Sequence, residues 1–406
     1  MPLIKPFAGL RPAAGQASAV AAPPYDVLTT SEARVRAAGK PWSFLHISKP
    51  EIDLPPDTDP YSPIVYAKAM ENLQAMLKAG ILQQDGQACY YAYRLKMGEH
   101  VQTGFVAAAS VADYDTNRIR KHEFTRPDKE DDRVRQIEAL NAQTGPVLLA
   151  YPSSVSADTL IVEASRGAPD AEVTADDGIQ HTLWVVRDSA LIDQISATFD
   201  IMPALYIADG HHRSAAASRV AAARNAKGES AYFLAVIFPH HQMRIMDYNR
   251  VVKDLNSLDE AGLLAAIGKN FTVAESTTQV RPARPGEFGM YLKGRWLRLT
   301  INPELIPAQD PVARLDVSLL SDHLLGPILG IADLRRDKRI DFVGGIRGLG
   351  ELEKRVNSGE MSVAFALHPT QMTDLMAVAD AGEVMPPKST WFEPKLADGL
   401  VSHMLD

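Results

Sequence analysis

The sequence predicts a mixed α/β fold. Short apolar runs of strand length alternate along the chain with segments whose apolar residues recur at helical spacing. The clearest pair is an apolar run at 204–208, followed by a turn at Asp209-Gly210 and an alanine-rich helix at about 214–225. With 406 residues, of which 46% are hydrophobic and 23% charged, the chain is long enough for two or three globular domains.

The N-terminal part is expected to wrap around a core before regular elements begin. Prolines interrupt residues 1–60 and disfavour long helices and strands there, but Tyr25, Trp42 and Phe44 should anchor the segment. Helical spacing of apolar residues predicts a helix over 61–79 that ends at Gly80. A hairpin follows at 88–96 and 101–111, then a polar stretch over 114–132 and a helix near 134–143.

The remaining elements follow the same two patterns. Strands are predicted at 148–151, 182–186, 232–238, 244–252, 340–343 and 363–367, with a strand–turn–strand at 290–299. Helices are predicted at 191–199, 258–267, 315–325 and 370–379. A change in composition near Leu255 divides the chain into domains at 1–254 and 255–406, and the last segment is expected to return to the site.

Composition and charge exclude several classes of protein. The net charge of -8 argues against a protein that coats nucleic acid or binds an anionic membrane surface. The single cysteine, Cys89, excludes an internal disulfide framework and a cysteine-rich zinc site. The sequence shows no signal peptide and no apolar run long enough to span a membrane. We therefore expect a cytoplasmic protein that acts on small molecules, in an oligomeric state that the sequence leaves open.

The segment Asp209-Gly210-His211-His212-Arg213 is predicted to bind phosphate. It lies between a buried strand and a helix, where free backbone N–H groups and the helix dipole favour an anion. Arg213 adds a planar cation that can hold a phosphate with two hydrogen bonds. Asp209 is either a Mg²⁺ ligand or a cap of the helix. The alternative is a strand–turn–helix in which the histidines only cap and form hydrogen bonds.

His122 and Glu123 form a second candidate group. A carboxylate beside an imidazole, between a strand and a helix, is a plausible general base pair. The pattern is not that of a zincin, because Arg126 stands where the second histidine would be required. The charged residues 128–132 that follow are expected to form a solvated loop before a helix.

Two further segments offer possible contacts with substrate or phosphate. Tyr25 and Asp26 follow two prolines that fix the backbone, which suits a substrate contact and equally suits a structural turn. Lys388 and Ser389 follow another pair of prolines and resemble half of a phosphate loop without its glycines. The alternative for this second segment is a docking tail.

The chain resembles a widespread bacterial, serine-kinase-like family that is similar to the archaeal free serine kinase of the ParB/sulfiredoxin superfamily. The matching motifs lie at 6–12, 22–27, 122–125, 129–133, 208–213 and 385–390. The resemblance implies a ParB/sulfiredoxin-like nucleotide-binding core with inserted and appended α/β segments. It also implies that the turn at 210–213 holds nucleotide phosphates and that Glu123, after His122, is the base. His211 replaces the catalytic cysteine of sulfiredoxins, and we find no helix-turn-helix of the DNA-partitioning proteins.

Three functions remain open at this point. The leading hypothesis is a kinase of serine metabolism that transfers a phosphoryl group from ADP or ATP to a hydroxyl, with free L-serine as the implied acceptor and Mg²⁺ as the implied cofactor. The alternatives are a metal-dependent hydrolase and a nucleotide-binding regulatory module without catalytic activity. The hydrolase would use His122, Glu123, Asp209, His211 and His212.

Overall fold

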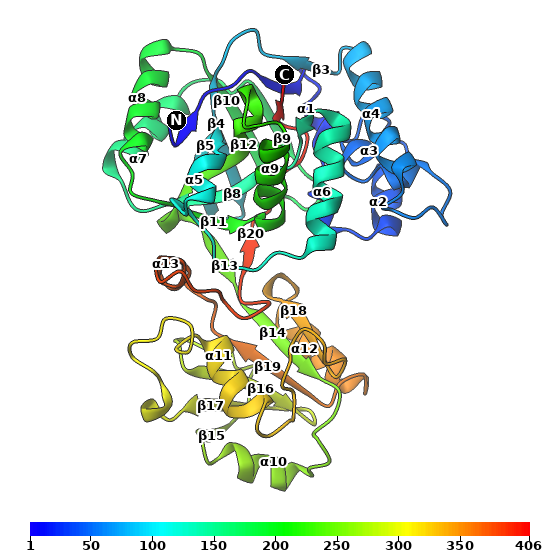
Figure 1. Cartoon of the computed structure of the whole chain (residues 1–406). Helices are drawn as coiled ribbons and strands as arrows, with labels where there is room; N and C mark the ends of the chain where they lie inside the picture. Colours follow the sequence, from blue (N-terminus) through cyan, green and yellow to red (C-terminus); the bar gives the residue numbers. More distant parts are fainter. The chain divides into compact units, whose positions relative to one another are not determined.

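A computed structural model describes residues 1–406 and shows a mixed α/β protein with several sheets. The chain forms two compact units, the first comprising Met1–Met243 and Pro394–Asp406 and the second Arg244–Glu393 (Figure 1). The boundary that composition suggests, near 254, falls within the second unit. The reason is that β13 (Arg244–Met246) and β14 (Tyr248–Val252) pair with other strands of that unit.

The first unit contains a 9-stranded sheet in the order β6-β11-β8-β12-β5-β4-β10-β9, with β1 added beside β5. At its centre, β12 is buried at every position, as expected for a continuous apolar run with strands on both sides. The predicted hairpin is formed by β4 and β5. The strands are β1 (Ile4–Lys5), β4 (Tyr90–Met97), β5 (His100–Ser110), β6 (Ile119–Arg120), β8 (Val147–Tyr151), β9 (Ala171–Thr174), β10 (Gln180–Val186), β11 (Leu205–Asp209) and β12 (Tyr232–Pro239).

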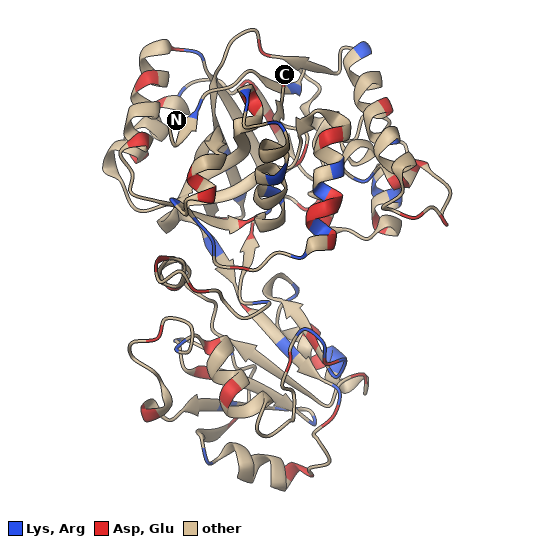
Figure 2. Cartoon of the chain, in the orientation of Figure 1, with Lys and Arg blue, Asp and Glu red and all other residues tan.

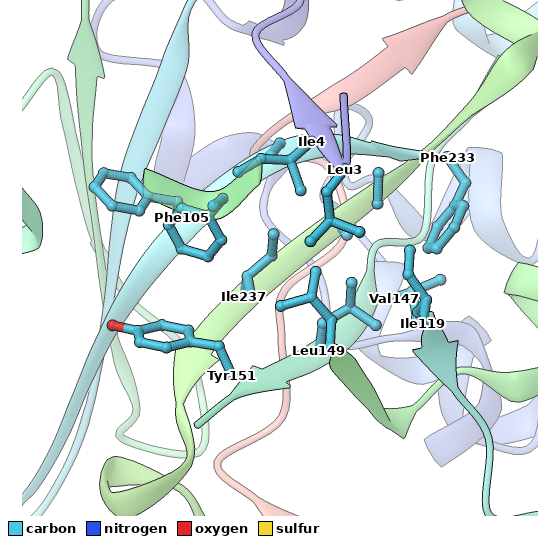
Figure 3. Packing of buried hydrophobic residues seen from close by; sticks show 14 of the residues in the cluster. Leu3, Ile4, Phe105, Ile119, Val147, Leu149, Tyr151, Phe233 and Ile237 are labelled. Atoms are coloured by element: carbon cyan, nitrogen blue, oxygen red, sulfur yellow. The ribbon is translucent and has the colours of Figure 1, made fainter. Parts of the chain in front are cut away.

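The main hydrophobic core lies against this sheet. Side chains from the strands pack with apolar residues of α5 (Val111–Asp115), α7 (Val155–Ala164), α8 (Ser189–Asp200) and α9 (His211–Ala223). No helix of the chain is both long enough and apolar enough to cross a membrane. Figure 3 labels part of the core: Leu3, Ile4, Phe105, Ile119, Val147, Leu149, Tyr151, Phe233 and Ile237.

A second core orders the proline-rich N-terminal segment, as the sequence predicted. Phe44 and Ile47 are fully buried there, together with residues of the long helix α4. A 4-stranded sheet, β3-β2-β21-β7, joins this region to the C-terminus of the chain. The elements are α1 (Ala17–Val20), α2 (Thr30–Ala37), α3 (Leu45–Ser48), α4 (Pro63–Lys78), β2 (Gly9–Pro12), β3 (Leu82–Gln84), β7 (Ala142–Gln143) and β21 (Ser402–Met404).

Helix α6 (Pro127–Leu140) begins earlier than the sequence predicted. Residues 128–132, expected to form a loop, are its first turns, and Figure 2 shows acidic and basic residues interspersed along it. Pro127 occupies the first helical position, where its missing N–H costs nothing, and acidic residues complement the helix dipole in the first turn. The expected loop was therefore wrong because charged residues without apolar spacing can still form a helix when the N-terminus is favourable.

The second unit is built on a 6-stranded sheet in the order β15-β17-β16-β19-β14-β18, in which every pairing is antiparallel. A separate pair is formed by β13 and β20. The further strands are β15 (Phe271–Ser276), β16 (Glu287–Leu292), β17 (Arg295–Ile301), β18 (Ile340–Gly344), β19 (Val363–Leu367) and β20 (Trp391–Glu393). The helices are α10 (Glu260–Ile267), α11 (Asp316–Leu320), α12 (Leu349–Asn357) and α13 (Met372–Asp380).

Candidate active site at the N-terminus of helix α9

The turn from β11 into α9 has the geometry of an anion site. Gly210 is the N-cap residue and has φ 100, a left-handed conformation that glycine adopts without strain. This conformation lets the helix begin at His211, earlier than the predicted start near 214. Gly210 provides no side-chain cap, so the N–H groups of the first turn remain available to a ligand.

Arg213 lies back against this turn, and its side chain is only 10% exposed. Its guanidinium donates to the Pro146 carbonyl and lies 3.9 Å from Asp26 Oδ2 and 3.7 Å from Asp209 Oδ1. A Cβ on Gly210 would stand 3.1 Å from Arg213 Cζ, so the glycine also makes room for the cation. The predicted phosphate-binding arginine is therefore at the turn, but it is buried among acceptors and does not lie in an open cleft.

Asp209 ends β11 between two cations. Its Oδ2 atom accepts a hydrogen bond from Lys395 Nζ at 3.1 Å, and Arg213 faces the other oxygen. Burial alone would raise the pKa of Asp209, but Lys395 and Arg213 hold this pKa well below its ordinary value. The carboxylate is therefore ionised at neutral pH. It is not a cap of α9, since the N-cap residue is Gly210.

His122 and Glu123, in the loop after β6, form a cluster with His211 on the first turn of α9. The two imidazole rings meet edge to face with centroids 4.5 Å apart, and both side chains are almost fully buried. Glu123 Oε2 lies 3.7 Å from His211 Nδ1, and the Glu123 side chain is 49% exposed. One potential metal-ligand atom from each of the three residues lies within 4.8 Å of the others.

Both histidines of this cluster are neutral at pH 7. Burial lowers the pKa of His122 to about 4, and burial together with His122 lowers the pKa of His211 well below its usual value. His211 Nε2 accepts the His122 backbone N–H at 3.4 Å. A neutral imidazole carries one proton, so in His211 this proton is on Nδ1, the atom that faces Glu123.

His212 belongs to another set of contacts. Its Nε2 atom accepts a hydrogen bond from the backbone N–H of Arg126, the N-cap residue of α6, at 3.1 Å. Burial lowers the pKa of His212, which keeps the ring neutral and able to accept. The structure therefore gives His212 a role in joining α9 to the start of α6, and contact with phosphate remains a prediction.

Tyr25 and Asp26 are brought to Arg213 by the short 3-10 turn Tyr25–Val27. The guanidinium of Arg133 lies over the Tyr25 ring, 3.9 Å from its centroid. Burial raises the pKa of the Tyr25 hydroxyl to about 12, so it remains protonated. The rigid turn predicted from the two prolines thus lies beside the anion site.

Lys388 and Ser389 are placed in the second unit. The hydroxyl of Ser389 donates to the Pro386 carbonyl, and the Lys388 carbonyl accepts from Arg250. Both hydrogen bonds stabilise the turn locally, within the second unit. A contact of either residue with substrate or phosphate stays a prediction.

A pocket opens beside Arg213 in the first unit. Its lining includes Tyr25, Ser48, Arg133, Gly145, Arg213 and Asp398. Its closed part measures about 30 Å³, which is room for roughly two water molecules.

Four residues of the site were not predicted from the sequence: Arg133, Gly145, Lys395 and Asp398. Arg133 stood within a matching motif, while the other three gave no signal in the sequence.

Asp398 is the most unusual group in the pocket. It is 1% exposed, and its Oδ1 atom has no hydrogen-bond partner. The C-terminal segment holds it in place through two backbone hydrogen bonds with Ala22, at 2.9 and 3.1 Å. Burial raises the pKa of Asp398 to about 7, although Arg213 opposes this shift.

We expect Asp398→Asn to stabilise the protein in a pH-dependent way. An unfolded aspartate has a pKa of about 3.9, so the folded state binds this proton more tightly. The wild-type protein therefore loses free energy of unfolding as pH rises from about 4 to about 7, and loses no more above that. The free energy of unfolding of the variant should exceed that of the wild-type protein by an amount that grows over the same pH range to roughly 4 kcal/mol. Urea unfolding of both proteins at several pH values tests this, and a difference independent of pH would contradict it.

Comparison with solved structures finds similarity at low identity. The free serine kinase in complex with AMP has a TM-score of 0.37 and 14% identity, over 71% of this chain and 86% of that one. A conserved hypothetical protein from Pyrococcus furiosus has a TM-score of 0.36 and 15% identity, over 74% and 95%. SbnI with C-terminal truncation from Staphylococcus aureus has a TM-score of 0.37 and 12% identity, over 72% and 85%. Similarity of this degree assigns no role to any residue here.

The sequence comparisons are more specific. No curated protein matches the chain significantly. Residues 4–318 match a family described as "Protein of unknown function (DUF1015)". Because this match covers most of the chain, the protein belongs to the DUF1015 family.

Proposed function

We propose that this protein is a small-molecule kinase that transfers a phosphoryl group from ADP or ATP to a hydroxyl group, with free L-serine as the leading acceptor. One observation carries the proposal. The first turn of α9 follows Gly210 without a side-chain cap, and its His211 Nδ1 lies 3.7 Å from the half-exposed carboxylate of Glu123. A phosphate site on the first turn of α9, with a base beside it, would supply the parts that phosphoryl transfer requires.

The donor phosphates would bind at the N-terminus of α9. Backbone N–H groups of the first turn and the helix dipole would hold the phosphate oxygens, as nucleotide sites of several folds do. Arg213 and Lys395 lie beside this turn and add positive charge. Neither cation is free of acceptors in this structure, so phosphate would compete with Asp209 and Asp26 for them.

Glu123 would act as the general base. It would take the proton of the acceptor hydroxyl while that oxygen bonds to the terminal phosphorus and the phosphorus–oxygen bond to the leaving nucleotide breaks. The electron pair of the broken bond stays on the nucleotide, which leaves as AMP from ADP or as ADP from ATP. His211 is a positioning residue in this scheme, because its Nδ1–H faces the Glu123 carboxylate.

The site offers one carboxylate oxygen that could bind Mg²⁺. Asp209 Oδ2 is occupied by Lys395, which leaves Oδ1 as the oxygen that Asp209 would offer the ion. One carboxylate is enough, because Mg²⁺ in nucleotide sites takes most of its other ligands from phosphates and water. When bound, the ion neutralises charge on the transferred group.

The test is a direct assay of the purified protein. It would be mixed with Mg²⁺, with ADP or ATP, and with a panel of amino acids and other small alcohols, and the products analysed by phosphorus NMR. A phosphorylated acceptor formed in proportion to the nucleotide consumed supports the proposal. Tight nucleotide binding without any phosphorylated product would instead support the regulatory module.

A metal-dependent hydrolase is the second candidate, and the cluster of His122, Glu123 and His211 favours it. Both ring nitrogens of His122 are buried without a hydrogen-bond partner, and two imidazoles with one carboxylate suit zinc or manganese. His212 is less suited, since Arg126 occupies its Nε2 atom. Zinc retained at one equivalent through dialysis would favour the hydrolase. Phosphoryl transfer by zinc-free protein with Mg²⁺ alone would exclude it.

A further inference from the structure

The pocket beside Arg213 contains two polar atoms without partners. Asp398 Oδ1 and Ser48 Oγ are both buried, and neither has a hydrogen bond within the protein. Both residues line the same pocket. Buried polar atoms are almost always paired, so two unpaired atoms facing one small space call for an explanation.

The cations of the pocket already have acceptors. Arg133 donates from Nε and from a terminal nitrogen to Asp132 Oδ2, at 3.0 and 2.6 Å. Arg213 donates to the Pro146 carbonyl and lies between the carboxylates of Asp26 and Asp209. The group that the pocket lacks is therefore a hydrogen-bond donor for Asp398 Oδ1, preferably one that carries positive charge.

We propose that this pocket binds a small ligand through a protonated primary amine, which donates to Asp398 Oδ1 and Ser48 Oγ. The closed part of the pocket, about 30 Å³, has room only for the amine, so an anionic group on the same ligand would lie in the open part of the pocket and face Arg213. A zwitterion adds no net charge to the pocket, whereas a phosphate would place negative charge against Asp398. Identifying this ligand with the phosphoryl acceptor rests on the proposed function, but the binding of the amine does not.

Gly145 is what keeps the space between the two charged groups open. A Cβ at this position would lie 3.7 Å from Asp398 Oδ1 and 3.4 Å from Arg213 Cδ. Both distances are ordinary van der Waals contacts, so alanine would fit without displacing either side chain and would occupy the space in which the ligand's amine must lie. Gly145→Ala therefore tests the pocket without disturbing the protein around it.

Binding is measured on the full-length protein by titration calorimetry without nucleotide. The probes are L-serine, ethanolamine, which lacks the carboxylate, and L-glycerate, in which a hydroxyl replaces the amine. We expect L-serine to bind and glycerate to bind about 10–100-fold more weakly, because an ionic hydrogen bond is replaced by a neutral one. Ethanolamine should keep part of the affinity of serine. A protein that binds neither amine, or that binds glycerate as well as serine, overturns the proposal.

Two variants and one matched control locate the binding. Asp398→Asn and Gly145→Ala should each weaken L-serine binding at least about tenfold, and Asp398→Asn should no longer distinguish serine from glycerate. The control is Asp316→Asn in the second unit. Asp316 is also a buried carboxyl with an unpartnered oxygen and a pKa raised to about 7 by burial, but it lies outside the pocket. Equal loss of affinity in the control would contradict the assignment.

The proposed function and this inference fail in different ways. If the protein binds amines through Asp398 but phosphorylates nothing, the kinase proposal is contradicted and the amine site is supported. If it phosphorylates hydroxy acids as well as amino acids, and Asp398→Asn leaves the KM for the acceptor unchanged, the kinase proposal is supported and the amine site is contradicted. Circular dichroism and thermal melting of each variant show whether a lost signal reflects binding or unfolding.

Discussion

Replacing Glu123 by glutamine should reduce phosphoryl transfer by about 10²–10⁴-fold while nucleotide affinity stays within a few-fold of the wild-type value. The substitution keeps the shape of the side chain and removes only its ability to accept a proton. Glu123 is 49% exposed, so the fold should tolerate the change. The variant distinguishes catalysis from nucleotide binding, because the proposed phosphate contacts lie at the N-terminus of α9 and not at Glu123.

Single-turnover kinetics and titration calorimetry with the same nucleotide would measure the two effects. Glu163→Gln is the matched control, since Glu163 is an exposed glutamate on α7 of the same unit. It should change neither quantity. Turnover of Glu123→Gln within a few-fold of the wild-type rate would exclude Glu123 as the base and direct attention to Asp26, an exposed carboxylate beside Arg213.

Replacing Arg213 by alanine should destabilise the protein by about 3–5 kcal/mol, because it removes the cation from a buried charged group. Asp209 and Asp26 would lose their common partner, and the Pro146 carbonyl would lose a donor. Its 10% exposure shows that this arginine does not lie in an open cleft. Nucleotide affinity should fall by roughly 2–3 kcal/mol as well.

The control for Arg213 lies on the same helix. Arg219 is 45% exposed and pairs with Glu130 and Asp131, so Arg219→Ala should cost no more than about 1 kcal/mol and leave nucleotide binding intact. Urea unfolding gives the stability of each variant. If Arg213→Ala does not fold, Arg213→Lys keeps the charge and loses the planar donor pair, so binding can still be compared. Wild-type nucleotide affinity in either variant would place the phosphate elsewhere.

Local patterns predicted most of the elements around the site. The apolar run, glycine turn and alanine-rich segment predicted β11 and α9, and the two runs around Gly98 predicted the β4–β5 hairpin. Such features depend on neighbouring residues, whose spacing is visible in the sequence. The start of α6 was not predicted because its first turns carry charged residues without apolar spacing. The packing of α6 against α9 is visible only in the folded protein.

The mixed α/β class, the turn from Asp209 to Arg213 and the likeness to a known family can all be recognised in the sequence. Which groups meet this turn is visible only in the folded protein. Glu123 reaches His211 from β6 and the loop after it, and Lys395 and Asp398 arrive because β21 pairs with β2 and β7. These contacts join residues far apart in the chain. No local pattern encodes them, because pairing between strands that are distant in the chain depends on how the whole sheet is buried.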